Sequence, residues 1–239
     1  MKKGLLLVVL VIFGLQSWGQ IKYIAKNLER FDERKYHFGF IVGANKGSLF
    51  LDLAPAQVLV ANNVTNIRVE PLPGLDLAIV ASYNLHKNIR IRTIPGISFQ
   101  DRKIHYTLIN EDGEAEDEFK VTETTNIELP LLLKFRTNRY GNFAAYALAG
   151  GKYSVDMASK KKKNSSSPDD QNKLLLDKKD ISATLGAGFD FFLPYFKFGL
   201  EVRYSRGTRN LLIPEGSQFT NPINGLRGQT FQFCMTFEG

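Results

Sequence analysis

The sequence of 239 residues contains a single cysteine, Cys234, and a single tryptophan, Trp18. One cysteine cannot form an intramolecular disulfide, so the fold is not of the disulfide-stapled kind found in many exported domains. After residue 15 no run of 18 apolar residues occurs, which excludes a transmembrane helix beyond the N-terminus. The sequence also lacks a Walker glycine loop, a metalloprotease His-Glu pattern and a nucleophile elbow. We therefore expect no catalytic residues of these classes, no cofactor and no metal.

The first 19 residues have the features of a secretory signal peptide. Residues 2–3 are lysines, residues 5–15 form a largely apolar run, and Ser17 and Gly19 are small residues with the spacing that signal peptidase requires. The apolar run is shorter than the roughly 20 residues of a membrane-spanning helix, although a short N-terminal anchor is the alternative. No cysteine follows the run, so lipoprotein processing is not expected. We predict cleavage near Gly19 and export.

Two charged segments stand out against a formal net charge of +7. Residues 160–163 are four lysines, followed by asparagine and three serines, which predicts a disordered loop tip or, alternatively, a contact for anionic lipopolysaccharide. Residues 111–118 hold six carboxylates, which predicts a solvated hairpin tip or, alternatively, oxygen ligands for a divalent cation. Basic residues are not interleaved with aromatic residues on one face, so we expect no nucleic-acid partner.

The C-terminal part of the chain alternates between apolar and polar residues with a period of two. Residues 181–191, 196–205 and 230–237 each place apolar side chains on one face and polar or small side chains on the other. This period predicts β-strands, because successive side chains of a strand point to opposite faces. Less regular alternation predicts five more strands, at residues 36–45, 75–83, 89–99, 125–135 and 143–153.

The connections between these eight segments alternate in length. The short connections are residues 85–88, 137–142 and 193–195. The long connections are residues 46–74, 101–121, 156–180 and 206–227. Short turns at one end, long loops at the other and an even strand number are typical of outer-membrane barrels. A soluble β-sandwich would alternate as well, but the Phe-rich apolar faces and the aromatic residues at strand ends favour the membrane.

The sequence therefore predicts an all-β protein, an eight-stranded antiparallel transmembrane β-barrel with short periplasmic turns and long outer loops. We expect it in the outer membrane of a Gram-negative cell, in contact with outer-membrane lipid. The predicted organisation is a signal peptide at residues 1–19, a periplasmic N-terminal segment at residues 20–34 and the barrel at residues 35–239.

Charged residues of both signs fall on the polar faces of the predicted strands. They are Asp76, Arg90, Arg92, Glu128, Lys134, Arg136, Asp190, Lys197, Glu201 and Arg203. An eight-stranded barrel has an interior just wide enough for side chains, and buried unpaired charges are costly. We expect these residues to form a paired network that fills the lumen; a narrow ion path lined by the same residues is the alternative.

His105 is the only histidine for which the sequence offers a catalytic hypothesis. Asp101 and Ser98 precede it in a predicted extension of one strand, and some outer-membrane enzymes use histidine with serine or aspartate at the barrel rim. No partner geometry is defined by the sequence, so an ordinary surface histidine is the favoured interpretation.

Three stretches resemble a known family. Residues 27–40 read NLERFDERKYHFGF and resemble the entry into the first strand of the PorT family, part of the type IX secretion machinery of Bacteroidetes. Residues 126–134 and 199–205 resemble that family and the broader superfamily of outer-membrane barrels. The resemblance covers essentially the whole mature chain.

The resemblance implies a non-enzymatic component needed for export of proteins that carry the type IX C-terminal signal, with other secretion-system proteins as partners. An eight-stranded barrel is too narrow to be the pore itself, so we expect an accessory or scaffold role. Five apolar residues of the N-terminal segment are candidates for a partner contact: Ile21, Tyr23, Ile24, Leu28 and Phe31. Alternatively, this segment covers the periplasmic mouth. The alternative function is a stand-alone small barrel for adhesion, surface protection or ion passage.

Overall fold

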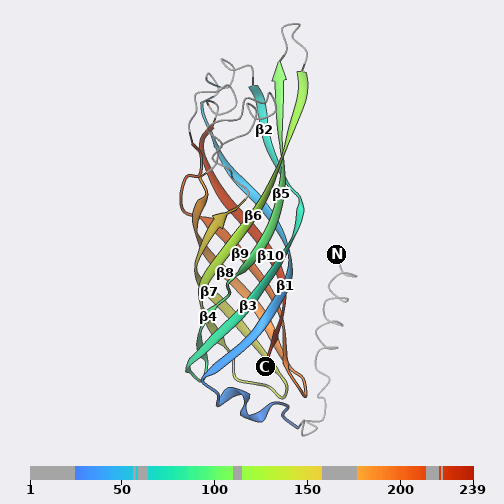
Figure 1. The fold of residues 1–239 in the computed structure, drawn as a ribbon, viewed down its shortest axis with the longest axis vertical. Coiled ribbons are helices and arrows are strands. Elements are labelled where there is room, and N and C mark those ends of the chain that lie inside the picture. The colour runs from blue at the N-terminus through green and yellow to red at the C-terminus, as the bar shows by residue number, and fades with distance from the viewer. Residues whose placement is uncertain are drawn as a thin grey trace, which may run out of the picture.

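The computed structural model describes residues 25–55, 58, 64–109, 115–157, 177–213, 221 and 223–239, and these residues form a closed antiparallel barrel (Figure 1). A short 3-10 helix, η1 (Glu29–Asp32), precedes the strands. The strands are β1 (Tyr36–Leu53), β2 (Val64–Pro71), β3 (Pro73–His86), β4 (Ile89–Thr93), β5 (Gly96–Ile109), β6 (Ala115–Arg136), β7 (Phe143–Asp156), β8 (Lys179–Phe192), β9 (Lys197–Gly207) and β10 (Ile223–Glu238).

The ten strand segments form eight barrel strands, because two of the barrel strands are each interrupted once. β2 and β3 are parts of one barrel strand, which is interrupted at Leu72. β4 and β5 are parts of another, which is interrupted at Ile94 and Pro95. Proline has no backbone N–H and cannot donate to the ladder, so Pro71, Pro73 and Pro95 account for breaks at these points. The predicted eight-stranded barrel is therefore confirmed.

The ring closes through β1. Along one edge β1 pairs with β10 from Gly39 to Leu53, and along the other edge it pairs with β3 from Tyr36 to Lys46. The helix η1 and the C-terminus lie at the end of the barrel that carries the three short turns (Figure 1). These turns occupy residues 87–88, 137–142 and 193–196, close to the predicted positions.

The first two of the predicted long loops, residues 46–74 and 101–121, are shorter than expected, because the strands continue into them. β1 runs on to Leu53, β2 lies wholly within predicted loop 46–74, and β5 and β6 take up most of predicted loop 101–121. In this outer part the inner face becomes apolar, although Phe50 of β1 still faces outward. The inner residues form one buried cluster: Leu49, Ile67, Ile104, Ile223 and Leu226. A search for outward apolar faces misses such strands, because they extend beyond the apolar band.

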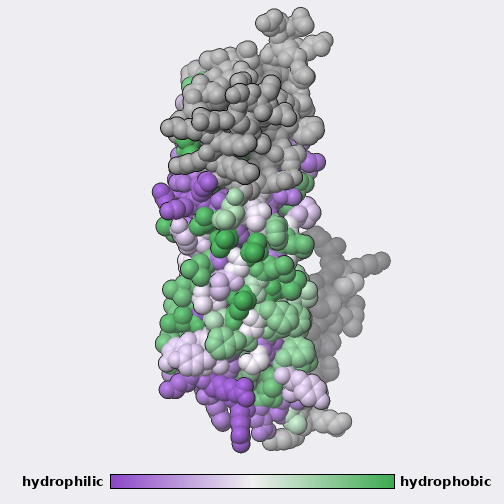
Figure 2. Space-filling model, viewed as in Figure 1, coloured by the Kyte–Doolittle hydropathy of each residue, from purple (hydrophilic) through white to green (hydrophobic). Residues whose placement is uncertain are grey.

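Around the middle of the barrel the apolar side chains face outward. Large exposed residues include Phe38 at 63%, Leu131 at 61% and Leu185 at 64% of their accessible surface. They contribute to a band of hydrophobic residues with hydrophilic residues above and below it (Figure 2). Among the described residues, no helix has the length and apolar character of a membrane span. A closed barrel with an apolar exterior and a polar interior is the arrangement that lets strands cross an outer membrane.

Candidate functional site

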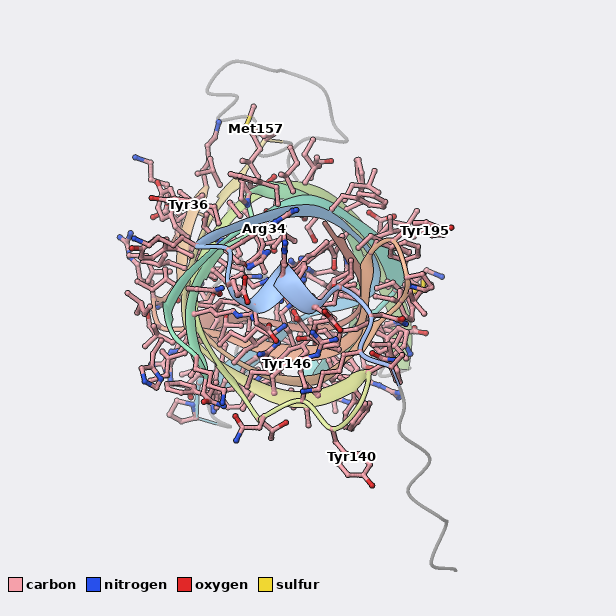
Figure 3. The ribbon with its side chains drawn as sticks, turned by 90° about the horizontal axis from the view of Figure 1, so that it is seen from below. Arg34, Tyr36, Tyr140, Tyr146, Met157 and Tyr195 are labelled. Atoms are coloured by element: carbon pink, nitrogen blue, oxygen red, sulfur yellow. The ribbon has the colours of Figure 1, made fainter. Side chains whose placement is uncertain are left out.

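The periplasmic mouth of the barrel is closed by η1, which lies across the ring when the barrel is seen from below (Figure 3). Leu28, immediately before η1, has a φ of 50° and is the one non-glycine residue with positive φ in the described part of the chain. Phe31 is only 4% exposed and stacks on His37 with 3.9 Å between ring centroids. It also meets the edge of Phe192 at 5.8 Å. We call residues 27–34 the plug.

A single carboxylate ties the plug to the barrel wall. Asp32 accepts a hydrogen bond from Arg136 at 2.7 Å and one from Arg90 at 2.9 Å, and Arg139 approaches it at 3.5 Å. Arg139 also donates to the carbonyl oxygen of Asn27 at 2.5 Å, which fixes the start of the plug. Burial alone would raise the pKa of Asp32, but the hydrogen bond from Arg136 and the surrounding positive charges outweigh it and hold that pKa below its usual value.

Release of the plug is expected in acid. Because the pKa of Asp32 is lower when the plug is docked, its contribution to docking is complete above the usual value of 3.8 and is lost as the pH falls through the docked value. Amides of residues 27–34 should therefore lose protection from hydrogen exchange below a pH of about 4. In Asp32→Asn the side chain does not titrate, so protection that falls in the same way in this variant would contradict the assignment.

Above the plug, the lumen holds a connected set of ion pairs. Arg92 donates to Glu201 at 2.5 Å and to Glu238 at 3.1 Å. Lys197 lies 2.8 Å from Glu238, and a second pair joins Lys134 to Asp190 at 2.9 Å. Each carboxylate therefore faces at least one cation from another strand, as the low dielectric of a side-chain-filled lumen requires.

Tyr146 belongs to this network although the sequence did not single it out. Its ring points into the lumen (Figure 3), its hydroxyl donates to Glu201 at 2.8 Å, and Lys134 Nζ lies 3.5 Å from its ring centroid. Its neighbour in the ladder is Gly188, where an added Cβ would lie 2.6 Å from the Tyr146 ring. The small residues of β8 thus make room for a large side chain of β7, which explains part of the less regular alternation in β7.

In the outer half of the lumen, the charged side chains bind neutral side chains as well as charged ones. Glu128 pairs with Lys152 at 2.7 Å. Asp76 accepts hydrogen bonds from Ser98 at 2.5 Å, from Asn45 at 2.7 Å and from Gln232 at 2.9 Å. A cavity of about 50 Å³ beside Glu128 and Lys152 has room for only a few water molecules. Over its described length the lumen is therefore filled with side chains.

All ten charged residues predicted from the sequence to face the lumen are buried, each no more than 7% exposed: Asp76, Arg90, Arg92, Glu128, Lys134, Arg136, Asp190, Lys197, Glu201 and Arg203. The structure brings nine of them into ion pairs, and Asp76 into hydrogen bonds with neutral groups. Sequence reasoning missed Glu238, the inward residue that continues the alternation of the last strand, and Asp32, which lies outside any strand. It also missed Arg102 and Lys152, which are buried on the inward faces of β5 and β7.

The candidate partner contacts of the N-terminal segment divide into two groups. Ile21, Tyr23 and Ile24 lie outside the described residues. Phe31 packs in the barrel mouth against Ala144 and Phe192, and the partly buried Leu28 packs beside it. The described part of the segment therefore covers the mouth, as the alternative had it, and a partner contact of these residues stays a prediction.

For the catalytic hypothesis at His105, the structure separates His105 from Ser98 and leaves Asp101, four residues before it, on the same face. Ser98 faces the lumen and is bonded to Asp76, whereas His105, an odd number of residues along the same strand, faces the opposite side and lies 3.0 Å from Glu70. In the described part of the chain no group of three or more His, Cys, Asp or Glu residues is placed to hold a metal ion. The side chains of residues 111–118 and of residues 160–163 lie outside the described part.

The apolar exterior, the charged lumen and the closed ladder together define a transmembrane barrel of the outer membrane. Residues 25–212 match the family of the outer membrane protein beta-barrel domain, and the chain belongs to this family. A comparison with curated proteins finds no match.

Solved structures to which the chain is similar include OprG from Pseudomonas aeruginosa, with 13% identity, a TM-score of 0.47 and coverage of 85% of this chain and 92% of OprG. Another is Ail, the attachment invasion locus protein of Yersinia pestis, solved with the heparin analogue sucrose octasulfate, with 13% identity, a TM-score of 0.39 and coverage of 86% of this chain and 100% of Ail. A third is the outer membrane protease OmpT from Escherichia coli, with 10% identity, a TM-score of 0.40 and coverage of 85% and 95%.

Proposed function

We propose that this outer-membrane barrel is a non-enzymatic accessory component of a type IX secretion machinery, with a scaffold role and not the role of a pore. The observation that carries the proposal is the coincidence of two features in one segment. Residues 27–40, which resemble the PorT family, are the residues that form the plug and lead from it into β1. Because the stretch that resembles the PorT family also closes the mouth, we place the contact with the secretion machinery at the periplasmic end of the barrel.

The closed lumen supports a scaffold over a channel. The plug covers the periplasmic mouth, and the ion pairs of Arg92, Lys134 and Lys197 fill the space above it. An extended polypeptide would have to displace these side chains and leave their partners unpaired, which is costly. Any contribution to protein export is then made through surfaces of the barrel.

The periplasmic turns offer such a surface. Tyr140 is 76% exposed and Tyr195 is 89% exposed, and both point away from the barrel (Figure 3). Tyrosine is enriched at protein interfaces and at the membrane boundary, because one part of its ring surface is apolar and its hydroxyl is polar. Together with the exposed charged residues of η1, these side chains form the surface that we assign to contact with another secretion-system protein.

The test is to delete the gene for this chain and quantify proteins in the medium, the outer membrane and the periplasm. Proteins with type IX C-terminal signals are expected to disappear from the medium and the cell surface and to accumulate in the periplasm. Re-expression of the intact chain should restore export. An unchanged distribution of these proteins would refute the role in secretion while leaving the barrel assignment intact.

A second candidate, a stand-alone barrel for adhesion or surface protection, is favoured by a different observation. β2, β5 and β6 continue beyond the apolar band, so the barrel presents ordered strands on its outer side. In the same deletion strain, loss of attachment to surfaces with normal export would favour this function.

A further inference from the structure

Three neighbouring strands carry a group of outward-facing cationic and aromatic side chains near their outer ends. In the ladder, Phe50 of β1 pairs with Arg227 of β10, and Gln229 of β10 pairs with Arg206 of β9. Arg206 and Arg227 are therefore diagonal neighbours on one face, with Cβ atoms about 7–8 Å apart. We call Phe50, Arg206 and Arg227 the outer-wall patch.

The cations of this patch have no counter-ion among the described residues. The guanidinium of Arg206 lies 5.0 Å from the ring centroid of Phe50, and neither Arg206 nor Arg227 forms an ion pair with a described carboxylate. Asp52, the next outward residue of β1, is a diagonal neighbour of Arg227 on the other side but forms no ion pair with it. Two like charges on adjacent strands repel each other, and an anion bound between them would remove this repulsion.

The position of the patch points to a lipid ligand. One step closer to the membrane centre, the same strands expose Tyr204 at 42% and Phe231 at 51%. The wall thus changes from apolar to cationic at the outer edge of the hydrophobic band, and hydrophilic residues border that band in Figure 2. Headgroups of the outer leaflet lie at this depth, and their acyl chains lie against the apolar wall below.

We propose that the outer-wall patch binds a phosphate group of a phosphorylated glycolipid in the outer leaflet. Guanidinium groups bind phosphate oxygens through paired, charge-assisted hydrogen bonds, and two of them are placed to hold one phosphate between them. The rings of Phe50, Tyr204 and Phe231 then contact the acyl chains or the sugar. This site is on the membrane-facing wall, separate from the loop lysines 160–163, and is independent of any role in secretion.

The proposal is tested with the full barrel in lipid nanodiscs that contain phosphorylated lipid A or its dephosphorylated form. Native mass spectrometry and lipid titration should show that the intact barrel retains phosphorylated lipid A about tenfold more tightly than the dephosphorylated lipid. The double variant Arg206→Gln/Arg227→Gln should lose that preference. The matched control is Arg68→Gln/Lys103→Gln, which removes two outward cations from β2 and β5 and should keep it.

Folding of each variant is checked by the mobility shift of the folded barrel on electrophoresis, and Arg206→Lys/Arg227→Lys serves as a second variant. Lysine keeps the charge but cannot form the paired hydrogen bonds of arginine, so a partial loss of preference is expected. An equal loss in the control variant, or no loss in the glutamine variant, would overturn the site. Displacement of the lipid by millimolar inorganic phosphate would overturn the lipid as its ligand.

Discussion

Replacement of Arg92 by methionine is expected to destabilise the barrel by about 3–5 kcal/mol, because the change leaves two buried carboxylates with fewer cations. Arg92 is fully buried and donates to both Glu201 and Glu238, which come from different strands. Methionine has a similar length and no charge, so the loss of pairing dominates over the loss of volume. Urea titration in lipid vesicles, followed by circular dichroism and by the electrophoretic shift of the folded barrel, measures the effect.

Arg68→Met is the matched control, because the same side-chain change is made on the exposed face of β2. A surface substitution of this kind should change the free energy of unfolding by less than about 0.5 kcal/mol. If Arg92→Met and Arg68→Met have equal effects, the lumen network does not stabilise the barrel. Simultaneous replacement of Arg92 and Glu238 by apolar residues is expected to cost less than Arg92→Met followed by loss of Lys197, because Glu201 then keeps Arg203 and Lys197 keeps Asp190 as ion-pair partners.

The alternation of the membrane-spanning part was sufficient to predict the barrel. Lipid outside and a narrow lumen inside impose opposite demands on successive residues, so Phe231, Phe233 and Met235 point out while Gln232 and Cys234 point in. The same logic located the lumen charges, because a charged residue between two lipid-facing residues has only the interior available. The short turns followed from the same segment boundaries.

The pairing of the lumen charges could not be predicted in this way. Arg92 on β4 meets Glu201 on β9 across the lumen, at a sequence separation of 109 residues. Such a contact depends on strand tilt and on the order of strands around the ring, which the alternation of a single strand does not specify. The outer cluster of Leu49, Ile67 and Ile104 was missed for another reason, because above the lipid the inner face becomes apolar.

The sequence could not decide whether the plug contacts a partner or covers the mouth, because an apolar residue in an irregular segment has no periodicity that indicates what it packs against. The ring of Phe31 could be buried equally well against another protein or in the barrel mouth, and the sequence allows both. The structure places it against His37 and Phe192, with Asp32 held by three arginines next to it. The segment that resembles the PorT family is thus docked in the mouth of this barrel, and variants that release it test its importance for export.

Phe31→Ala is expected to release the plug while leaving the barrel folded. The Phe31 side chain is almost fully buried, and truncation of a buried phenylalanine typically costs about 3–5 kcal/mol. Without the ring, the plug of eight residues keeps only the ion pairs of Asp32 and a few hydrogen bonds at its ends, such as those of Asn27, whereas the strands keep their ladder. Hydrogen exchange should therefore lose protection at residues 27–34 and keep it in the strands. Glu33→Ala, at an exposed position of the same segment, should change neither.

The same two variants, expressed in the deletion strain, separate the structural role of the plug from a role in export. If the docked plug is the form that a secretion partner recognises, Phe31→Ala should fail to restore export although the barrel is folded in the outer membrane, and Glu33→Ala should restore it. Restoration by both variants would mean that export does not need the docked plug, and the periplasmic turns with Tyr140 and Tyr195 would then be the surface to change next. Protection of residues 27–34 that persists in Phe31→Ala would show instead that the ion pairs of Asp32 hold the plug without the ring.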